Sequence, residues 1–183
     1  MTDELDLIKE VASRLENAGI KYMMTGSMAM AIYSTPRMTR DIDMVIQVSP
    51  DETGKIVNLF RGDFYIDESA VREAIRHHGM FNMIHNESII KFDFIVRKSE
   101  EYRVLEFSRR QQIDIGGMPV SVVTPEDLIL SKLVWAKESN SELQLLDVRL
   151  MLQSVNEFDN DYLQKWSDEM GVAELLKKAR ENE

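Results

Sequence analysis

The chain has 183 residues, of which 44% are hydrophobic and 30% are charged, as in an ordinary globular protein with one compact unit or a domain and a modest appendage. Its 32 acidic and 22 basic residues give a formal net charge of -10, which argues against an extended surface that binds duplex nucleic acid. The absence of cysteine excludes disulfides and thiolate zinc sites. The acidic N-terminus, and the lack of any apolar run near the ~20 residues of a membrane helix, predict a cytoplasmic protein with no membrane partner.

The first two thirds of the chain alternate between helical and strand periodicity. The expected helices cover residues 5–15, 27–33 and 68–78, with a further helix start at 49–52, and the expected strands cover residues 20–24, 41–48, 80–85 and 89–96. Gly116 and Gly117 lie between two β-rich segments and predict a hairpin turn. This part of the chain is therefore expected to form a mixed α/β unit.

The last third of the chain is helical. The run from Thr124 to Asp127 is the strongest helix-start signal, with a capping threonine followed by proline and two acids, and Gly171 separates the last two helical segments. We therefore expect an α/β domain over residues 1–123 and a helical region over residues 124–183 that packs on it. The predicted fold class is α/β (α+β), a small twisted mixed sheet with helices on one face, followed by a C-terminal helical bundle.

Two predicted strands carry aspartate on the face opposite to their apolar side chains. Side chains alternate along a strand, so Asp41 and Asp43 point to the same side, and Asp93 has the same relation to the apolar residues of a later strand. If the two strands are neighbours with the same face outward, the three carboxylates converge. Mutual repulsion would then raise their pKa values unless a cation joins them.

A divalent metal ion would remove that repulsion. Oxygen ligands without sulfur or imidazole favour Mg²⁺ or Mn²⁺ over zinc, and the metal could clamp a phosphate and activate an attacking hydroxyl. The alternative is that the same acids form ion pairs on a solvated sheet face. The candidate partners for those pairs are Arg37, Arg40, Lys91 and Arg97.

Gly26 and Ser27 follow the first expected strand and begin a short helix. This arrangement exposes backbone N–H groups at a helix N-terminus, where they can bind phosphate, and the Ser27 hydroxyl can add a hydrogen bond. For Gly26 taken alone, a tight strand-to-helix turn is the simpler explanation. The combination of a phosphate cradle, an Asp-x-Asp pair and a later acid indicates a nucleotide site more strongly than any one motif.

Several short motifs follow one another in a fixed order. They are Gly26-Ser27, Arg37-Met-Thr39-Arg-Asp41-Ile-Asp43, Asp93 within Lys-Phe-Asp-Phe-Ile, Pro125-Glu126-Asp127-Leu128 with Lys132, and Asp147 within Leu-Leu-Asp-Val-Arg. This order resembles the DNA polymerase beta-like nucleotidyltransferase superfamily, and most closely its small prokaryotic branch of abortive-infection (AbiEii-type) toxins. The resemblance spans about residues 20 to 155.

The resemblance implies an enzyme that uses a nucleoside triphosphate and Mg²⁺ (or Mn²⁺) in a two-metal reaction. Asp41, Asp43 and Asp93 would be both the catalytic carboxylates and the metal ligands. The nucleotide-binding residues that it implies are Gly26, Ser27, Arg37, Thr39, Arg40, Lys132 and Asp147. Lys132 and Asp147 also lie on largely apolar helical stripes, where an ion pair between the two helices would explain them equally well.

Two questions stay open at this point. The acceptor hydroxyl could belong to an RNA end such as that of tRNA, or to a protein, and the resemblance to toxins implies an antitoxin partner. The competing function is a catalytically silent nucleotide- or partner-binding module on the same fold. The presence of all three aspartates argues against this alternative. His77, His78 and His85 are expected at the surface or at the rim of the site.

Overall fold

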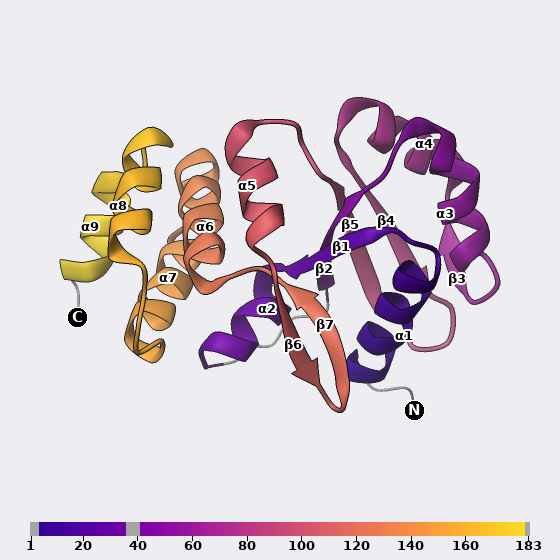
Figure 1. The fold of residues 1–183 in the computed structure, drawn as a ribbon, viewed down its shortest axis with the longest axis horizontal. Helices are drawn as coiled ribbons and strands as arrows, with labels where there is room; N and C mark the ends of the chain where they lie inside the picture. Colours follow the sequence, from indigo (N-terminus) through magenta and orange to yellow (C-terminus); the bar gives the residue numbers. More distant parts are fainter. Residues whose placement is uncertain (1–3, 36–40, 182–183) are drawn as a thin grey trace. The chain divides into compact units, whose positions relative to one another are not determined.

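The structure is a computed structural model that describes residues 4–35 and 41–181 (Figure 1). The helices are α1 (Glu4–Asn17), α2 (Gly26–Tyr33), the 3₁₀ turn η1 (Pro50–Glu52), α3 (Thr53–Phe60), α4 (Glu68–His77), α5 (Glu101–Arg109), α6 (Pro125–Ser139), α7 (Glu142–Ser154), α8 (Asn160–Glu169) and α9 (Ala173–Glu181). The strands are β1 (Lys21–Thr25), β2 (Asp41–Gln47), β3 (Phe64–Ile66), β4 (Met80–His85), β5 (Lys91–Val96), β6 (Gln111–Ile115) and β7 (Met118–Val122).

All seven strands belong to one mixed sheet, in the order β3-β4-β5-β2-β1-β7-β6. The pairs β2–β5 and β1–β7 are parallel, and the other neighbours are antiparallel. The predicted mixed α/β fold is therefore confirmed. Strand β3 was not expected, because three residues are too few to establish a period of two.

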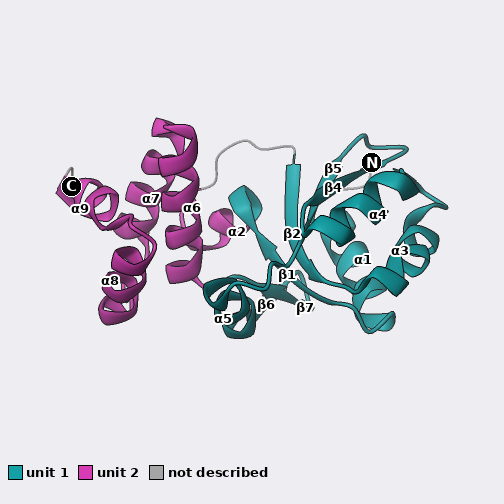
Figure 2. Ribbon diagram, turned by 90° about the horizontal axis from the view of Figure 1, so that it is seen from above, with its two compact units in different colours: residues 1–28, 38–123 teal, residues 29–37, 124–183 magenta. Residues whose placement is uncertain are grey.

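The chain divides into two compact units (Figure 2). One unit holds Met1–Met28 and Met38–Val123 and contains the whole sheet. The other holds Ala29–Arg37 and Thr124–Glu183, and it includes helices α6 to α9. Within the described residues, no helix has both the length and the apolarity that a membrane span requires.

The centre of the sheet buries one wholly apolar face. Ile42 and Met44 of β2 and Phe92 and Phe94 of β5 are all at most 1% exposed, and Phe60 of α3 covers them with its ring centroid 5.9 Å from that of Phe94. Burial of each such side chain contributes roughly 1.5–3 kcal/mol. A slip of one residue in either strand would bring at least one aspartate onto this buried face, so the burial fixes which residues face outward.

The predicted hairpin at the two adjacent glycines is confirmed. Gly116 and Gly117 have φ angles of +59° and +87°, and they connect the antiparallel strands β6 and β7. The Asp114 carboxylate accepts a hydrogen bond of 3.1 Å from the Gly117 backbone N–H, which closes the turn. Both glycines adopt the left-handed backbone region that other residues enter at a cost.

The start of α6 is built around a fully buried aspartate. The Thr124 side chain caps the helix by accepting from the backbone N–H of Asp127, as the sequence predicts. The Thr124 hydroxyl donates to the Asp127 carboxylate at 2.7 Å, and the Tyr162 hydroxyl donates to the same carboxylate at 2.6 Å. Because Tyr162 lies in α8, the cap also holds α8 against α6.

Helices α6 and α7 share a buried ion pair. The Lys132 ammonium lies 2.6 Å from an Asp147 carboxylate oxygen and donates to the Gln144 side-chain oxygen at 3.2 Å. The two charged side chains are only 4% and 0% exposed. The predicted structural explanation for Lys132 and Asp147, a salt bridge that joins two helices, is therefore confirmed.

We predict that loss of one member of this pair destabilises the helical unit strongly. Lys132→Met leaves the Asp147 carboxylate buried without its cation, which costs about 3–5 kcal/mol of unfolding free energy, whereas Lys132→Met/Asp147→Leu removes both charges and costs much less. Urea unfolding followed by tryptophan fluorescence measures this, because both tryptophans, Trp135 and Trp166, lie in this unit.

Lys177→Met is the matched control for this prediction. Lys177 pairs with Glu181 at 3.7 Å on the surface, with side chains 67% and 64% exposed, so its loss should change stability by no more than about 0.5 kcal/mol. An equal effect of Lys132→Met and Lys177→Met would contradict a structural role for the buried pair.

Candidate functional site

A row of polar side chains crosses the centre of the sheet on the face opposite to the aromatic core. Asp43 of β2 lies directly beside Asp93 of β5 in the parallel pairing. Thr25 of β1 is the register partner of Asp43, and Asn82 of β4 is the register partner of Asp93. Neighbouring strands are about 4.8 Å apart, so the side chains of such a row are adjacent. The structure therefore places two of the three predicted carboxylates side by side.

The third carboxylate reaches the same cluster through a lysine. Asp41 is the register partner of Lys91, one row along from Asp43 and Asp93. The Lys91 ammonium lies 3.2 Å from an Asp41 oxygen and 3.0 Å from an Asp93 oxygen. The hydrogen bond to Asp93, supported by that to Asp41, raises the pKa of Lys91 although partial burial opposes the shift. The sequence analysis left open that the aspartates form ion pairs with nearby basic residues. The structure contains such ion pairs with Lys91.

Asp93 carries an unsatisfied oxygen. Its Oδ2 atom binds Lys91, whereas its Oδ1 atom is buried and has no hydrogen-bond partner among the described residues. A buried carboxylate oxygen without a donor is costly and calls for a cation or a donor that binds later. Among the described residues, no group of three or more histidine, aspartate or glutamate side chains is placed to hold a metal ion. Lys91 is the cation that Asp41 and Asp93 share.

Gly26 gives Asp43 the space that its side chain occupies. Gly26 has a φ angle of +67°, and a Cβ atom built on it would lie 2.0 Å from the Asp43 Oδ2 atom. No side chain larger than hydrogen therefore fits between the end of β1 and this carboxylate. Helix α2 begins at Gly26, so the N–H groups of its first turn, including that of Ser27, start beside Asp43.

The remaining predicted site residues lie elsewhere. Arg37, Thr39 and Arg40 are outside the described residues. Lys132 and Asp147 belong to the helical unit, where they bind each other. Thr25 and Asn82 were not anticipated as neighbours of the carboxylates, because strand order and register decide which residues share a row and periodicity reveals neither.

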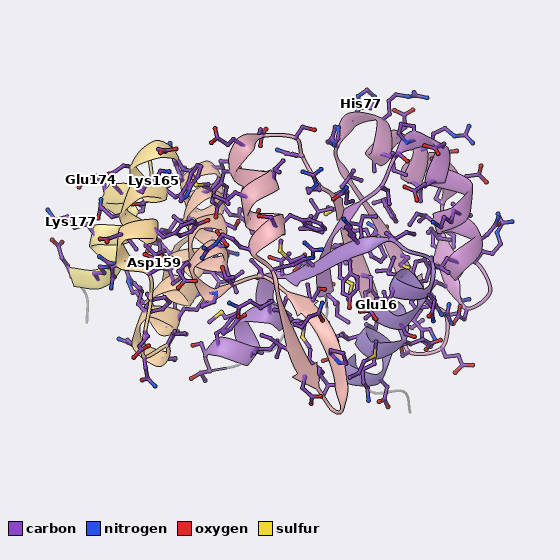
Figure 3. All side chains as sticks on the ribbon, viewed as in Figure 1. Glu16, His77, Asp159, Lys165, Glu174 and Lys177 are labelled. Atoms are coloured by element: carbon purple, nitrogen blue, oxygen red, sulfur yellow. The ribbon has the colours of Figure 1, made fainter. Side chains whose placement is uncertain are left out.

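The histidines are divided between surface and interior. His77 and His78 are exposed, and His77 lies at the end of α4 (Figure 3). His85 is only 6% exposed, so the expectation of a surface or rim position is wrong for it. Its Nδ1 atom lies 2.8 Å from the Ser88 hydroxyl, and its ring packs edge-on against Phe64 of the unexpected strand β3.

Solved structures with a similar fold are nucleotidyltransferases or resemble them. An antigenic nucleotidyltransferase-like protein from Paracoccidioides brasiliensis is 19% identical, with a TM-score of 0.62 over 96% of this chain and 93% of that one. The enzyme ANT(2")-Ia, solved with adenylyl-2"-tobramycin, is 13% identical, with a TM-score of 0.59 over 92% and 97%. The lincosamide antibiotic adenylyltransferase LnuA is 12% identical, with a TM-score of 0.57 over 84% and 99%. At these identities the likeness shows a shared fold.

A family comparison covers nearly the whole chain. No curated protein matches it, but the family model described as the nucleotidyl transferase AbiEii toxin of type IV toxin–antitoxin systems matches residues 13–181. The match includes the sheet, the three aspartates and the helices α6 to α9. The resemblance drawn from the motifs is confirmed: this chain belongs to the AbiEii family of nucleotidyl transferase toxins.

Proposed function

We propose that this protein transfers a nucleoside monophosphate from a nucleoside triphosphate to an acceptor hydroxyl, with Asp41, Asp43 and Asp93 as metal ligands. The observation that carries the proposal is the in-register pairing of Asp43 with Asp93, with Asp41 one row away on the same face. Two carboxylates in this relation repel each other unless a cation lies between them. Members of a nucleotidyl transferase family act on nucleotides, so a metal ion at these carboxylates would bind the phosphates of the nucleotide.

The donor set suits Mg²⁺ or Mn²⁺. It consists of carboxylate oxygens alone, and the buried Oδ1 atom of Asp93 still lacks a partner among the described residues. Bound divalent ions would supply charge neutralisation for the triphosphate and would lower the pKa of the acceptor hydroxyl. Gly26 supports this use, because it lets the Asp43 carboxylate lie against the backbone where α2 begins.

Different residues of the chain would have different roles in the transfer. The backbone of Gly26 and the hydroxyl of Ser27 would bind the terminal phosphates at the start of α2. Asp93 would receive the proton of the acceptor hydroxyl, whose oxygen forms the new bond to the α-phosphorus while the bond to the leaving pyrophosphate breaks. The leaving charge would be countered by cationic and polar side chains. We assign this role to Arg37, Thr39 and Arg40, and not to Lys132 and Asp147, which bind each other inside the helical unit.

The acceptor is a macromolecule in our proposal. The family is described as a toxin of a toxin–antitoxin system, and a toxin of this chemistry would inactivate a cellular RNA such as tRNA, or a protein, by adding a nucleotide to it. An antitoxin protein would be the partner that limits the activity. The net charge of -10 favours a protein acceptor or a locally bound RNA end over an extended RNA surface.

Calorimetric titration with Mg²⁺ and each nucleoside triphosphate tests the site directly. We expect metal-dependent triphosphate binding by the wild type and its loss in Asp41→Asn/Asp43→Asn, because the variant lacks two metal ligands. Glu73→Gln/Glu87→Gln is the matched control, since it removes two exposed acids from the same unit. A folded wild type that binds no triphosphate under any metal condition would contradict the proposal and favour a partner-binding module on the same fold.

Gly26→Ala should impair the site without unfolding the protein. The added methyl group must move the Asp43 carboxylate, and a displacement of about 1 Å in such a site costs roughly 100-fold in activity. Gly54→Ala is the control, because a Cβ atom there meets nothing within 4 Å and helix α3 gains a better helix former. Transfer of labelled nucleotide to total RNA or protein measures the effect. Equal activity of both variants would remove Gly26 from the site.

A further inference from the structure

We infer that Lys91 is a displaceable counter-ion of the carboxylate cluster. Its ammonium offsets part of the negative charge of Asp41 and Asp93, and it leaves these carboxylates when a divalent metal ion binds. The inference rests on the proposed function and adds a residue to it. It makes Lys91 a positioning residue that sets how tightly the carboxylate cluster binds a metal ion.

The contacts of Lys91 place it in direct competition with a metal ion. Its Nζ atom lies 3.2 Å from the Asp41 Oδ2 atom and 3.0 Å from the Asp93 Oδ2 atom, so it uses one oxygen of each of two proposed ligands. Register places Asp41 beside Lys91 and Asp43 beside Asp93, with all four side chains on one face of β2 and β5. A cation of higher charge that binds these oxygens must therefore exchange with the ammonium.

The exposure of Lys91 makes that exchange feasible. Its side chain is 33% exposed and ends a flexible four-carbon stem, so the ammonium can move into water by rotation about side-chain bonds. The other lysine–aspartate contact described above differs in this respect. The Lys132 side chain is 4% exposed and that of Asp147 is 0% exposed, so the Lys132 ammonium cannot move from Asp147 into water. This pair is a structural link.

The cluster also needs a cation before any metal arrives. Asp93 is only 7% exposed, and its Oδ1 atom has no partner in the described part of the chain. Without Lys91 the adjacent carboxylates would be held together with less compensating charge, and the metal-free fold would lose stability. Lys91 therefore stabilises the carboxylate cluster at the expense of metal affinity.

Titration with Mn²⁺ alone, in the absence of nucleotide, measures this competition. The free ion is counted by electron paramagnetic resonance in wild type, Lys91→Met, Lys91→Arg and Lys55→Met. We expect Lys91→Met to bind Mn²⁺ roughly tenfold more tightly than wild type, because two ion-pair contacts no longer oppose binding. Lys91→Arg keeps a cation and should stay near wild type. Lys55→Met is the matched control, since Lys55 pairs with Glu52 away from the cluster.

Thermal unfolding in EDTA gives a second readout that does not depend on activity. Lys91→Met should unfold about 2–4 °C below wild type without metal and should gain more than wild type when Mn²⁺ is added. If Lys91→Met does not fold, Lys91→Gln replaces it in both measurements. Unchanged or weaker Mn²⁺ binding by the folded variant would overturn the inference.

The two proposals fail in different ways. A wild type that binds Mg²⁺ and a nucleoside triphosphate, combined with equal Mn²⁺ affinity in Lys91→Met and wild type, removes only the role of Lys91. A folded wild type that binds no metal–nucleotide complex removes the proposed function, and the inference about Lys91 falls with it.

Discussion

The parallel pairing of β2 with β5 is the constraint on which the candidate site depends. The pairing sets Asp43 against Asp93 and Asp41 against Lys91, residue for residue. It is held in this register by the apolar side chains on the opposite face, because a slip by one residue would bury carboxylates and expose phenylalanines. The core side chains and the site side chains thus lie on opposite faces of the same strands. A change in strand register would therefore alter both. The site therefore needs no flexible loop to bring its acids together.

A carboxylate cluster on a rigid sheet is electrostatically unfavourable, and the surrounding residues reduce that cost. Lys91 supplies positive charge to Asp41 and Asp93. Gly26 removes the one Cβ atom that would force the Asp43 side chain out of place. What is left is the buried Oδ1 atom of Asp93, which has no donor among the described residues. In the proposed function, a divalent metal ion satisfies this oxygen.

The sequence predicts which residues share a face of the sheet better than it predicts which residues become neighbours across strands. Alternation along β2 and β5 predicts the shared face of Asp41, Asp43 and Asp93, because the period of a strand is local. The rows that add Thr25 and Asn82 depend on strand order, which no local pattern encodes. The burial of His85 was missed for a related reason, since the Phe64 ring that packs against it lies in β3, a strand of three residues. The positions of Lys132 and Asp147 on apolar helical stripes allow either an ion pair or contact with phosphate. Only the packing of the two helices shows that the two side chains pair with each other.

The contacts of Lys91 and of Lys132 with aspartates show how burial separates an exchangeable ion pair from a fixed one. Between α6 and α7 both partners are removed from water, so any exchange of partners would expose a buried charge and unfold the helices locally. At the sheet, Lys91 and Asp41 remain partly in water, so the same chemistry can be broken and re-formed at little cost. The proposed transfer, in which a metal ion and a triphosphate bind and pyrophosphate leaves, requires contacts of the second kind. The exchangeable contact lies on the same face of β2 and β5 as the three aspartates, where the proposed turnover would take place.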